Sequence, residues 1–142
     1  MTSPNQKVMI VPCSGIGKSY GTVSREAAYV VTEDLRPGQT QLVPLALLVL
    51  GDADSCSDIS ACPAVTIDGC KLGCAAKMVL QSGGRIAQEF AVLDVYRRNK
   101  NLKPQGIAEL NAGGQELARV LADEVSAVVD GLISGKLGGE NA

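Results

Sequence analysis

Cysteines are the residues of this sequence best suited to chemistry. The chain contains five, at positions 13, 56, 62, 70 and 74, and it contains no histidine. Soft thiolate sulfurs are ligands for zinc and for iron–sulfur clusters, and they are also nucleophiles. Catalysis by a Ser–His–Asp or Cys–His arrangement within this chain is excluded. The sequence therefore predicts a thiolate metal site or metal-free thiol chemistry, beside the plainer alternative that the cysteines are small buried apolar residues.

A second feature is the segment 11–19, which reads VPCSGIGKS. Its last three residues match the end of a phosphate-binding P-loop. Pro12 stands where the first glycine of that loop belongs, and proline has no N–H to offer a phosphate. We therefore interpret the loop as one that presents Cys13, with its glycines serving the turn. Nucleotide binding at Lys18 and Ser19 is a weaker alternative, as is an anion held there by a helix N-terminus.

Apolar runs and helical patterns alternate along the chain and must position these residues. Short apolar runs predict four strands, at 7–12, 40–50, 64–68 and 85–94, with a buried helix as an alternative at 40–50 and a polar loop at 51–55. Helical spacing predicts helices at 19–35, 70–81 and 116–133. We therefore expect a single α/β domain over residues 1–142, with about four mostly parallel strands, helices on both faces and a flexible tail at 135–142.

This arrangement predicts where the thiols lie. Cys13 follows the first strand, Cys56 follows the second strand and its polar loop, and Cys70 follows the third, with Cys74 one helical turn later. The carboxyl ends of parallel strands meet at one edge of a sheet, so we expect Cys13, Cys56, Cys70 and Cys74 to cluster there and to bind a metal. The start of a helix at Cys70 would favour thiolates. Cys62 precedes the third strand, which places it at the opposite edge and outside the site.

The junction of the third strand and the next helix reads IDGCKLGCAAK over residues 67–77. Gly69 is expected to permit the sharp turn and Asp68 to cap the helix. Together with Cys-Ser-Gly at 13–15, this segment resembles the DGC family, proteins regarded as zinc-binding because they contain several cysteines able to chelate a metal. The resemblance spans roughly residues 8 to 95.

The resemblance implies that Cys13, Cys70 and Cys74 are metal ligands. Many relatives have a further cysteine in a region that reads Val43-Pro44-Leu45 here. The fourth ligand is therefore chosen on geometry, which favours Cys56. A site of only three cysteines would leave one coordination position open, and such a site permits catalysis.

Composition limits the partners of the chain. The 142 residues are 46% hydrophobic and 20% charged, as expected of a globular protein. A net charge of -2 and only three tyrosines and one phenylalanine argue against nucleic-acid binding. The run at 43–50 is too short to cross a membrane, and the N-terminus lacks the pattern of a signal peptide. We therefore expect a cytoplasmic protein with reduced thiols, while its oligomeric state and any protein partner stay open.

Two functions follow from these residues. The first is a metal-binding protein that holds zinc, or an iron–sulfur cluster, through the cysteine cluster. The second is an enzyme of thiol exchange or sulfur transfer, in which Cys70 or Cys74 is the activated thiolate and Cys13 is the resolving partner. The first predicts bound metal, and the second predicts reactive thiols in metal-free protein.

Overall fold

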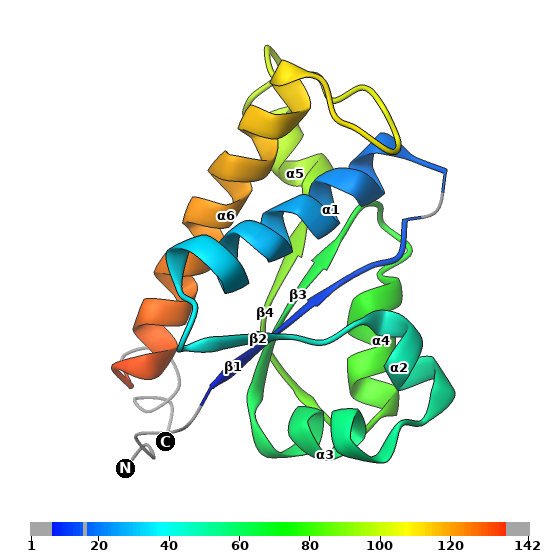
Figure 1. Cartoon of the computed structure of the whole chain (residues 1–142), viewed down its shortest axis with the longest axis vertical. Coiled ribbons are helices and arrows are strands. Elements are labelled where there is room, and N and C mark those ends of the chain that lie inside the picture. The colour runs from blue at the N-terminus through cyan, green and yellow to red at the C-terminus, as the bar shows by residue number, and fades with distance from the viewer. Residues whose placement is uncertain (1–6, 16, 136–142) are drawn as a thin grey trace.

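The computed structural model describes residues 7–15 and 17–135. Four parallel strands form one sheet in the order β2-β1-β3-β4, with helices around it (Figure 1). The strands are β1 (Val8–Pro12), β2 (Thr40–Leu42), β3 (Pro63–Asp68) and β4 (Arg85–Ala91). The tail predicted at 135–142 lies outside the described residues except for Gly135.

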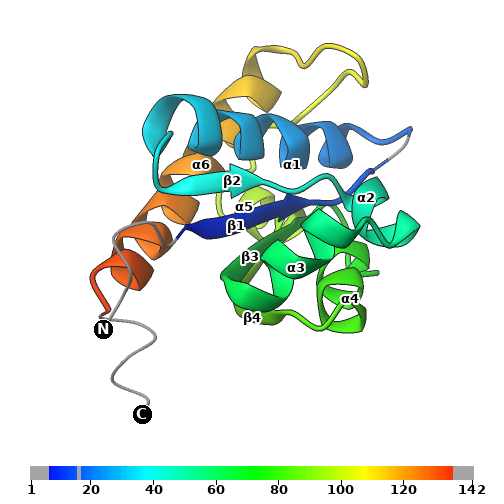
Figure 2. The ribbon, with the colours of Figure 1, turned by 60° about the horizontal axis from the view of Figure 1, so that its bottom comes forward.

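Helices cover both faces of the sheet. One layer consists of α1 (Ser19–Tyr29), its π-helical continuation η1 (Val30–Leu35), α5 (Val92–Arg97) and α6 (Ala112–Ile133). The other layer consists of α2 (Leu45–Leu50), α3 (Ala53–Ala61) and α4 (Cys74–Gln81). Figure 2 shows α1 on one side of the sheet and α3 and α4 on the other. The predicted α/β class, with parallel strands and helices on both faces, is confirmed.

The strand β1 is buried on both faces, which explains its unbroken apolar sequence. Side chains alternate along a strand. Val8 and Ile10 accordingly pack in the core beneath α1 and α6, whereas Met9 and Val11 pack in the core beneath α2, α3 and α4. The two cores fix the register of β1 and therefore the position of Cys13, which follows it.

The second predicted strand differs from the structure in length and in place. β2 has three residues and lies at the edge of the sheet beside β1. Pro44 ends the strand because proline has no N–H for the ladder, and Leu45–Leu50 then forms α2, the helix considered as the alternative. The expected polar loop is also shorter, because the Asp52 carboxylate accepts a hydrogen bond from the Ser55 N–H and begins α3.

The helix predicted at 70–81 starts later than its pattern suggests. Gly73 has φ +65°, a left-handed conformation that interrupts the helix, and α4 begins at Cys74. Cys70 therefore lies in a connection over residues 69–73 rather than in the first turn of a helix. The fourth strand is also shorter than predicted, since β4 ends at Ala91 and the helix α5 begins at Val92.

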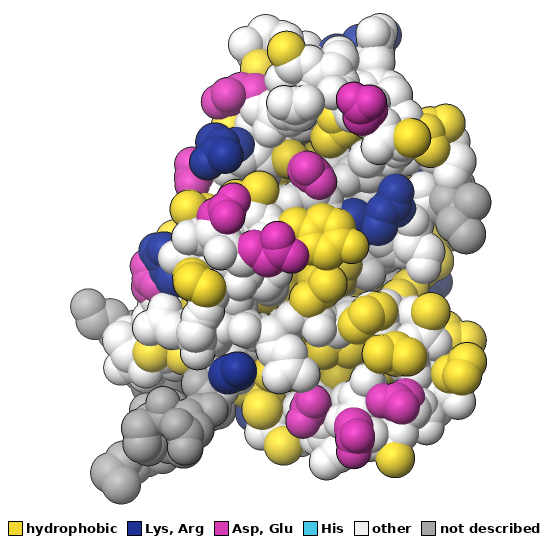
Figure 3. All heavy atoms as spheres, viewed as in Figure 1, with side chains coloured by type: hydrophobic (Ala, Val, Ile, Leu, Met, Phe, Trp, Pro, Cys, Tyr) yellow, Lys and Arg dark blue, Asp and Glu magenta, His cyan; other side chains and the backbone are white. Residues whose placement is uncertain are grey.

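The two sides of the molecule differ in surface chemistry. Basic and acidic side chains are interspersed over α1 and α6, and hydrophobic side chains gather around α2 (Figure 3). The exposed apolar side chains of α2 are those of Leu47, Val49 and Leu50, and Leu80 is exposed on the neighbouring α4. Over residues 7–15 and 17–135, no helix combines the length and apolar character needed to cross a membrane.

Candidate functional site

The site lies where the strand order reverses. The chain leaves β1 into α1 on one face of the sheet, and it leaves the neighbouring β3 into α4 on the other face. Connections that diverge in this way open a crevice beyond the carboxyl ends of the strands, where α/β proteins bind ligands. A pocket of about 310 Å³ occupies this position, and Cys13, Cys70 and Cys74 are among the residues that line it.

Cys13 is the buried member of the three, with 7% of its surface exposed. Its backbone N–H donates to the Ile67 carbonyl at 2.9 Å, which continues the pairing of β1 with β3. Its sulfur accepts a hydrogen bond from the Gly69 N–H at 3.1 Å and lies 3.8 Å from the Ser24 hydroxyl. Burial raises the pKa of the Cys13 thiol, although the Gly69 N–H acts in the opposite direction. Burial therefore disfavours the thiolate form of Cys13, and these contacts hold its sulfur in one place.

Three glycines allow the thiol-bearing segments to meet. A Cβ atom on Gly15 would overlap the backbone of Gly21, and one on Gly21 would overlap Gly15. A Cβ atom on Gly69 would lie 3.0 Å from the Gly21 nitrogen and 3.1 Å from the Tyr20 carbonyl carbon. Gly69 does not have a positive φ. The chain bends at Gly69 as predicted, but without a left-handed backbone, and the glycine also permits this close approach of backbones.

Asp68 holds the start of α4 against the end of β3. Its carboxylate is 5% exposed and accepts hydrogen bonds from the N–H groups of Ala75, at 2.8 Å, and Ala76, at 3.3 Å. These donors belong to the first turn of α4, so the prediction that Asp68 caps this helix is confirmed. Burial raises the pKa of Asp68, while the two N–H groups and Lys77 oppose that rise. Cys74, the first residue of α4, is positioned by this contact.

The other two pocket thiols differ from Cys13 in their surroundings. Cys70 is half-buried in the connection that leads from β3 to α4, and Cys74 is exposed where α4 begins. Neither is therefore packed into the core as Cys13 is. The structure thus combines one fixed thiol with two that lie closer to solvent.

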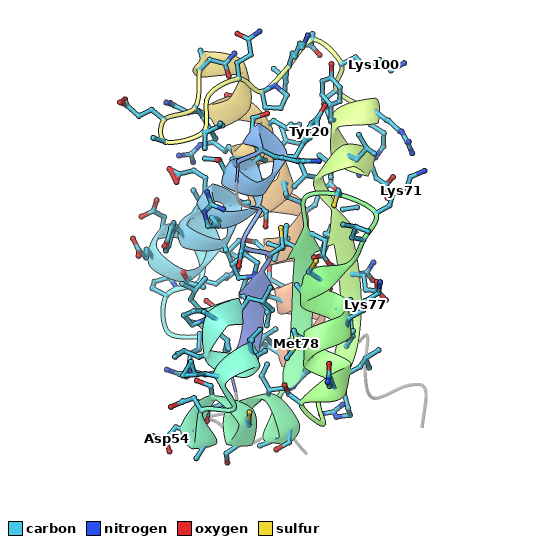
Figure 4. All side chains as sticks on the ribbon, turned by 90° about the vertical axis from the view of Figure 1, so that its right-hand side faces the viewer. Tyr20, Asp54, Lys71, Lys77, Met78 and Lys100 are labelled. Carbon is cyan, nitrogen blue, oxygen red and sulfur yellow. The ribbon has the colours of Figure 1, made fainter. Side chains whose placement is uncertain are left out.

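Cys56 does not line this pocket, which corrects the predicted four-thiol cluster. It lies in α3 and packs against the core beneath α2, α3 and α4. Figure 4 shows Tyr20, which lines the pocket, toward one end of the molecule and Asp54, near Cys56 in α3, at the other end. The cause is the short β2: two helices, rather than a loop, follow it and return the chain to the start of β3. Cys62 directly precedes β3 and does not line the pocket, as predicted.

The loop that resembles a P-loop contributes a cation to the pocket. Lys18 is the residue directly before α1, and it lines the pocket. Pro12 is the last residue of β1. The Ser19 hydroxyl donates to the Pro104 carbonyl at 3.3 Å, so it is already engaged with the segment before α6. The sequence analysis did not single out Gly21. Glycine is a poor helix former, so a glycine in the first turn of a predicted helix could have indicated a close contact at this position.

The donor atoms of the pocket are of the kind that a thiophilic metal prefers, but their positions do not yet form a metal site. Both carboxylate oxygens of Asp68 accept N–H groups, which leaves the three thiols as the soft donors of the pocket. Within the described part of the chain, however, no three cysteine, aspartate or glutamate side chains are already placed to hold a metal ion. Metal binding by the three thiols therefore requires a local change of conformation.

Comparison with known proteins identifies one family. A family model described as DGC domain matches residues 9–129, which is most of the chain. The matched segment begins in β1 and ends in α6, so it contains the three pocket thiols together with Asp68 and Gly69. No curated protein and no solved structure matches the chain.

Proposed function

The chain belongs to the DGC domain family, and we propose that it is a metal-binding protein that holds zinc through Cys13, Cys70 and Cys74. The observation that carries this proposal is that these three thiols line one pocket at the carboxyl edge of the sheet. Thiolate sulfur is a preferred zinc ligand, and three thiolates leave one position of a tetrahedral site open. When bound, zinc would act as a Lewis acid toward a group in that position.

The proposal assigns different parts to the two sides of the pocket. Cys13 is fixed by the β1–β3 pairing and by the Gly69 N–H, so it is the anchor. Cys70 and Cys74 belong to the connection and the helix start, where Gly73 gives the backbone freedom. On metal binding, this connection moves so that Cys70 and Cys74 approach Cys13. Each ligating thiol gives up its proton, so zinc affinity rises with pH.

Zinc titration with a competing chromophoric chelator tests the proposal. The protein is prepared without oxygen and compared with the variants Cys13→Ser, Cys70→Ser and Cys74→Ser. The chain supplies matched controls, because Cys56→Ser and Cys62→Ser remove thiols outside the pocket. We expect one zinc per chain in the unaltered protein and in both controls, and at least tenfold weaker binding in each pocket variant. Equal binding in all five variants, or loss of zinc in Cys56→Ser, would refute the assignment.

An iron–sulfur cluster accepts the same thiolates and is the alternative cofactor. The same oxygen-free preparation distinguishes the two, because a cluster brings iron, sulfide and visible absorption. We place the protein in the cytoplasm, since either site requires reduced thiols. Colourless protein with zinc supports the first cofactor, and brown protein with iron supports the second.

Thiol–disulfide exchange is the second candidate function. The exposed position of Cys74 favours it, because Cys74 is open to a reagent and the resolving thiol, Cys13, lines the same pocket. In this function two thiols reduce one small disulfide, forming a protein disulfide and releasing two small thiols. Metal-free protein would then release two equivalents of glutathione from oxidised glutathione, whereas Cys74→Ser would release at most the one equivalent that accompanies formation of a mixed disulfide. Stoichiometric zinc with no such release would reject this function.

A further inference from the structure

The pocket has room for more than a metal ion. Its volume of about 310 Å³ lies at the lower end of the range of small-molecule sites. Leu45, Leu72 and Tyr20 supply apolar wall beside the three thiols. A ligand of a few heavy atoms could therefore share the pocket with the thiols.

The exposed charge in the pocket lining is positive. Lys18 and Asp68 are the charged side chains that line the pocket. Asp68 is buried, and its two oxygens accept hydrogen bonds from the N–H groups at the start of α4, which partly offset its negative charge. Lys18 is exposed, and the ion pairs of the described residues, which join Arg36 to Asp130, Arg97 to Asp94 and Arg98 to Glu124, do not include it. The first turn of α1, which Lys18 precedes, contains no acidic residue.

We propose that the pocket selects a small thiol that carries a carboxylate or another anionic group, with its sulfur at the three cysteines and its anionic group at Lys18. The coordination half rests on the proposed function, because the sulfur of this ligand occupies the fourth position of a three-cysteine zinc site. The selection half rests on the charge of Lys18 alone. A neutral thiol of the same size meets the same sulfur chemistry but gains no ion pair.

Alkylation of metal-free protein tests the selection half. Iodoacetate and iodoacetamide transfer similar groups to a thiolate with loss of iodide, and they differ in charge. The ratio of their rates at Cys70 and Cys74, read by mass spectrometry, is compared with the ratio at Cys56 and Cys62 outside the pocket. We expect the ratio of the iodoacetate rate to the iodoacetamide rate to be about fivefold higher at the pocket thiols than at Cys56 and Cys62. A change of about fivefold corresponds to the energy of about one ion pair in a water-accessible site.

A pair of lysine variants assigns that preference. Lys18→Gln removes the cation of the pocket, whereas Lys71→Gln removes a cation next to Cys70 in sequence that does not line it. Figure 4 shows Lys71 directed outward. The preference for iodoacetate disappears in Lys18→Gln and persists in Lys71→Gln. A preference that survives Lys18→Gln, or that is absent from the unaltered protein, would overturn the selection half.

Calorimetric titration of zinc-loaded protein tests the coordination half. The probes are 3-mercaptopropionate, which is anionic, and 2-mercaptoethanol, which is neutral, with zinc content checked after each titration. The anionic thiol is expected to bind about fivefold more tightly, and Lys18→Gln abolishes the difference. Retained zinc with no binding of either thiol would overturn the coordination half alone. Failure to load zinc refutes the proposed function and this half with it, while the alkylation ratio still decides whether Lys18 selects anions.

Discussion

The Gly69 backbone N–H donates a hydrogen bond to the Cys13 sulfur, with the nitrogen and the sulfur 3.1 Å apart. This contact joins the end of β1 to the residue that directly precedes Cys70. The backbone of Gly69 also packs closely against the first turn of α1, which helps to hold this contact in place. The end of β1 and the connection that contains Cys70 are therefore linked at a fixed point, and the proposed metal site requires the connection beyond Gly69 to move.

Adding a methyl group at Gly69 tests this close approach. In Gly69→Ala the new Cβ lies 3.0 Å from the Gly21 nitrogen, so the connection is pushed away from α1. Overpacking of this kind costs about 1–3 kcal/mol of unfolding free energy, and zinc affinity falls as well. Urea denaturation and zinc titration measure the two effects. Gly38→Ala is the matched control, because its Cβ meets nothing within 4 Å and it does not have a positive φ; equal losses in both variants would contradict the argument.

Truncating Asp68 should loosen the start of α4. Asp68→Ala leaves the N–H groups of Ala75 and Ala76 without their acceptor in a buried place, which costs about 1–3 kcal/mol. Asp68→Asn costs less, because the amide retains one acceptor and lacks the charge whose burial raises the pKa of Asp68. Unfolding free energies of the two variants test this order. An Asn variant less stable than the Ala variant would show that the charge itself holds the helix.

Thr66 offers a stabilising substitution. Within the described residues, its hydroxyl is buried without a hydrogen-bond partner in the middle of β3. Thr66→Val replaces that hydroxyl by a methyl group of similar size and should raise the unfolding free energy by about 1 kcal/mol. Thermal and urea unfolding check the gain. A loss of stability would mean that the hydroxyl is satisfied by buried water.

Acid should weaken the link between η1 and α6. The Arg36 guanidinium donates two hydrogen bonds to the Asp130 carboxylate, at 2.6 and 2.7 Å, and lowers the pKa of Asp130 below its ordinary 3.8. A lowered pKa means that this stabilisation is present above pH 3.8 and is lost as the pH falls through the folded value. Asp130→Asn, compared with the unaltered protein at about pH 6 and about pH 3, should therefore lose less stability on acidification. An equal loss would show that the pair contributes nothing.

Much of the fold could be predicted from the sequence because burial leaves a strong pattern. The continuous apolar runs of β1 and β3 and the long amphipathic α6 identified the parallel sheet and its cover. The run at 40–50 was ambiguous, since a buried strand and a short buried helix have the same composition. Pro44 was the available signal, because proline cannot continue a ladder.

The positions of the site residues could be predicted wherever the segments that connect the strands were predicted correctly. Cys13 and Cys70 each follow a strand of the sheet interior, and they line the same pocket, as expected. Cys56 was misplaced because the two helices between β2 and β3 were expected to be strand and loop. The backbone contact of Gly15 with Gly21 depends on how two distant segments pack, and a periodic pattern carries no such information.

Zinc K-edge X-ray absorption of the zinc-loaded protein, in buffer free of small thiols, reports the ligands of the metal. A three-cysteine site with an open position gives three sulfur scatterers at about 2.3 Å and one nitrogen or oxygen scatterer at about 2.0–2.1 Å. Cys56→Ser should leave this spectrum unchanged, and Cys70→Ser should lower the sulfur count. Four sulfur scatterers in the unaltered protein, or a shell of oxygen and nitrogen alone, would contradict a three-cysteine site with an open position.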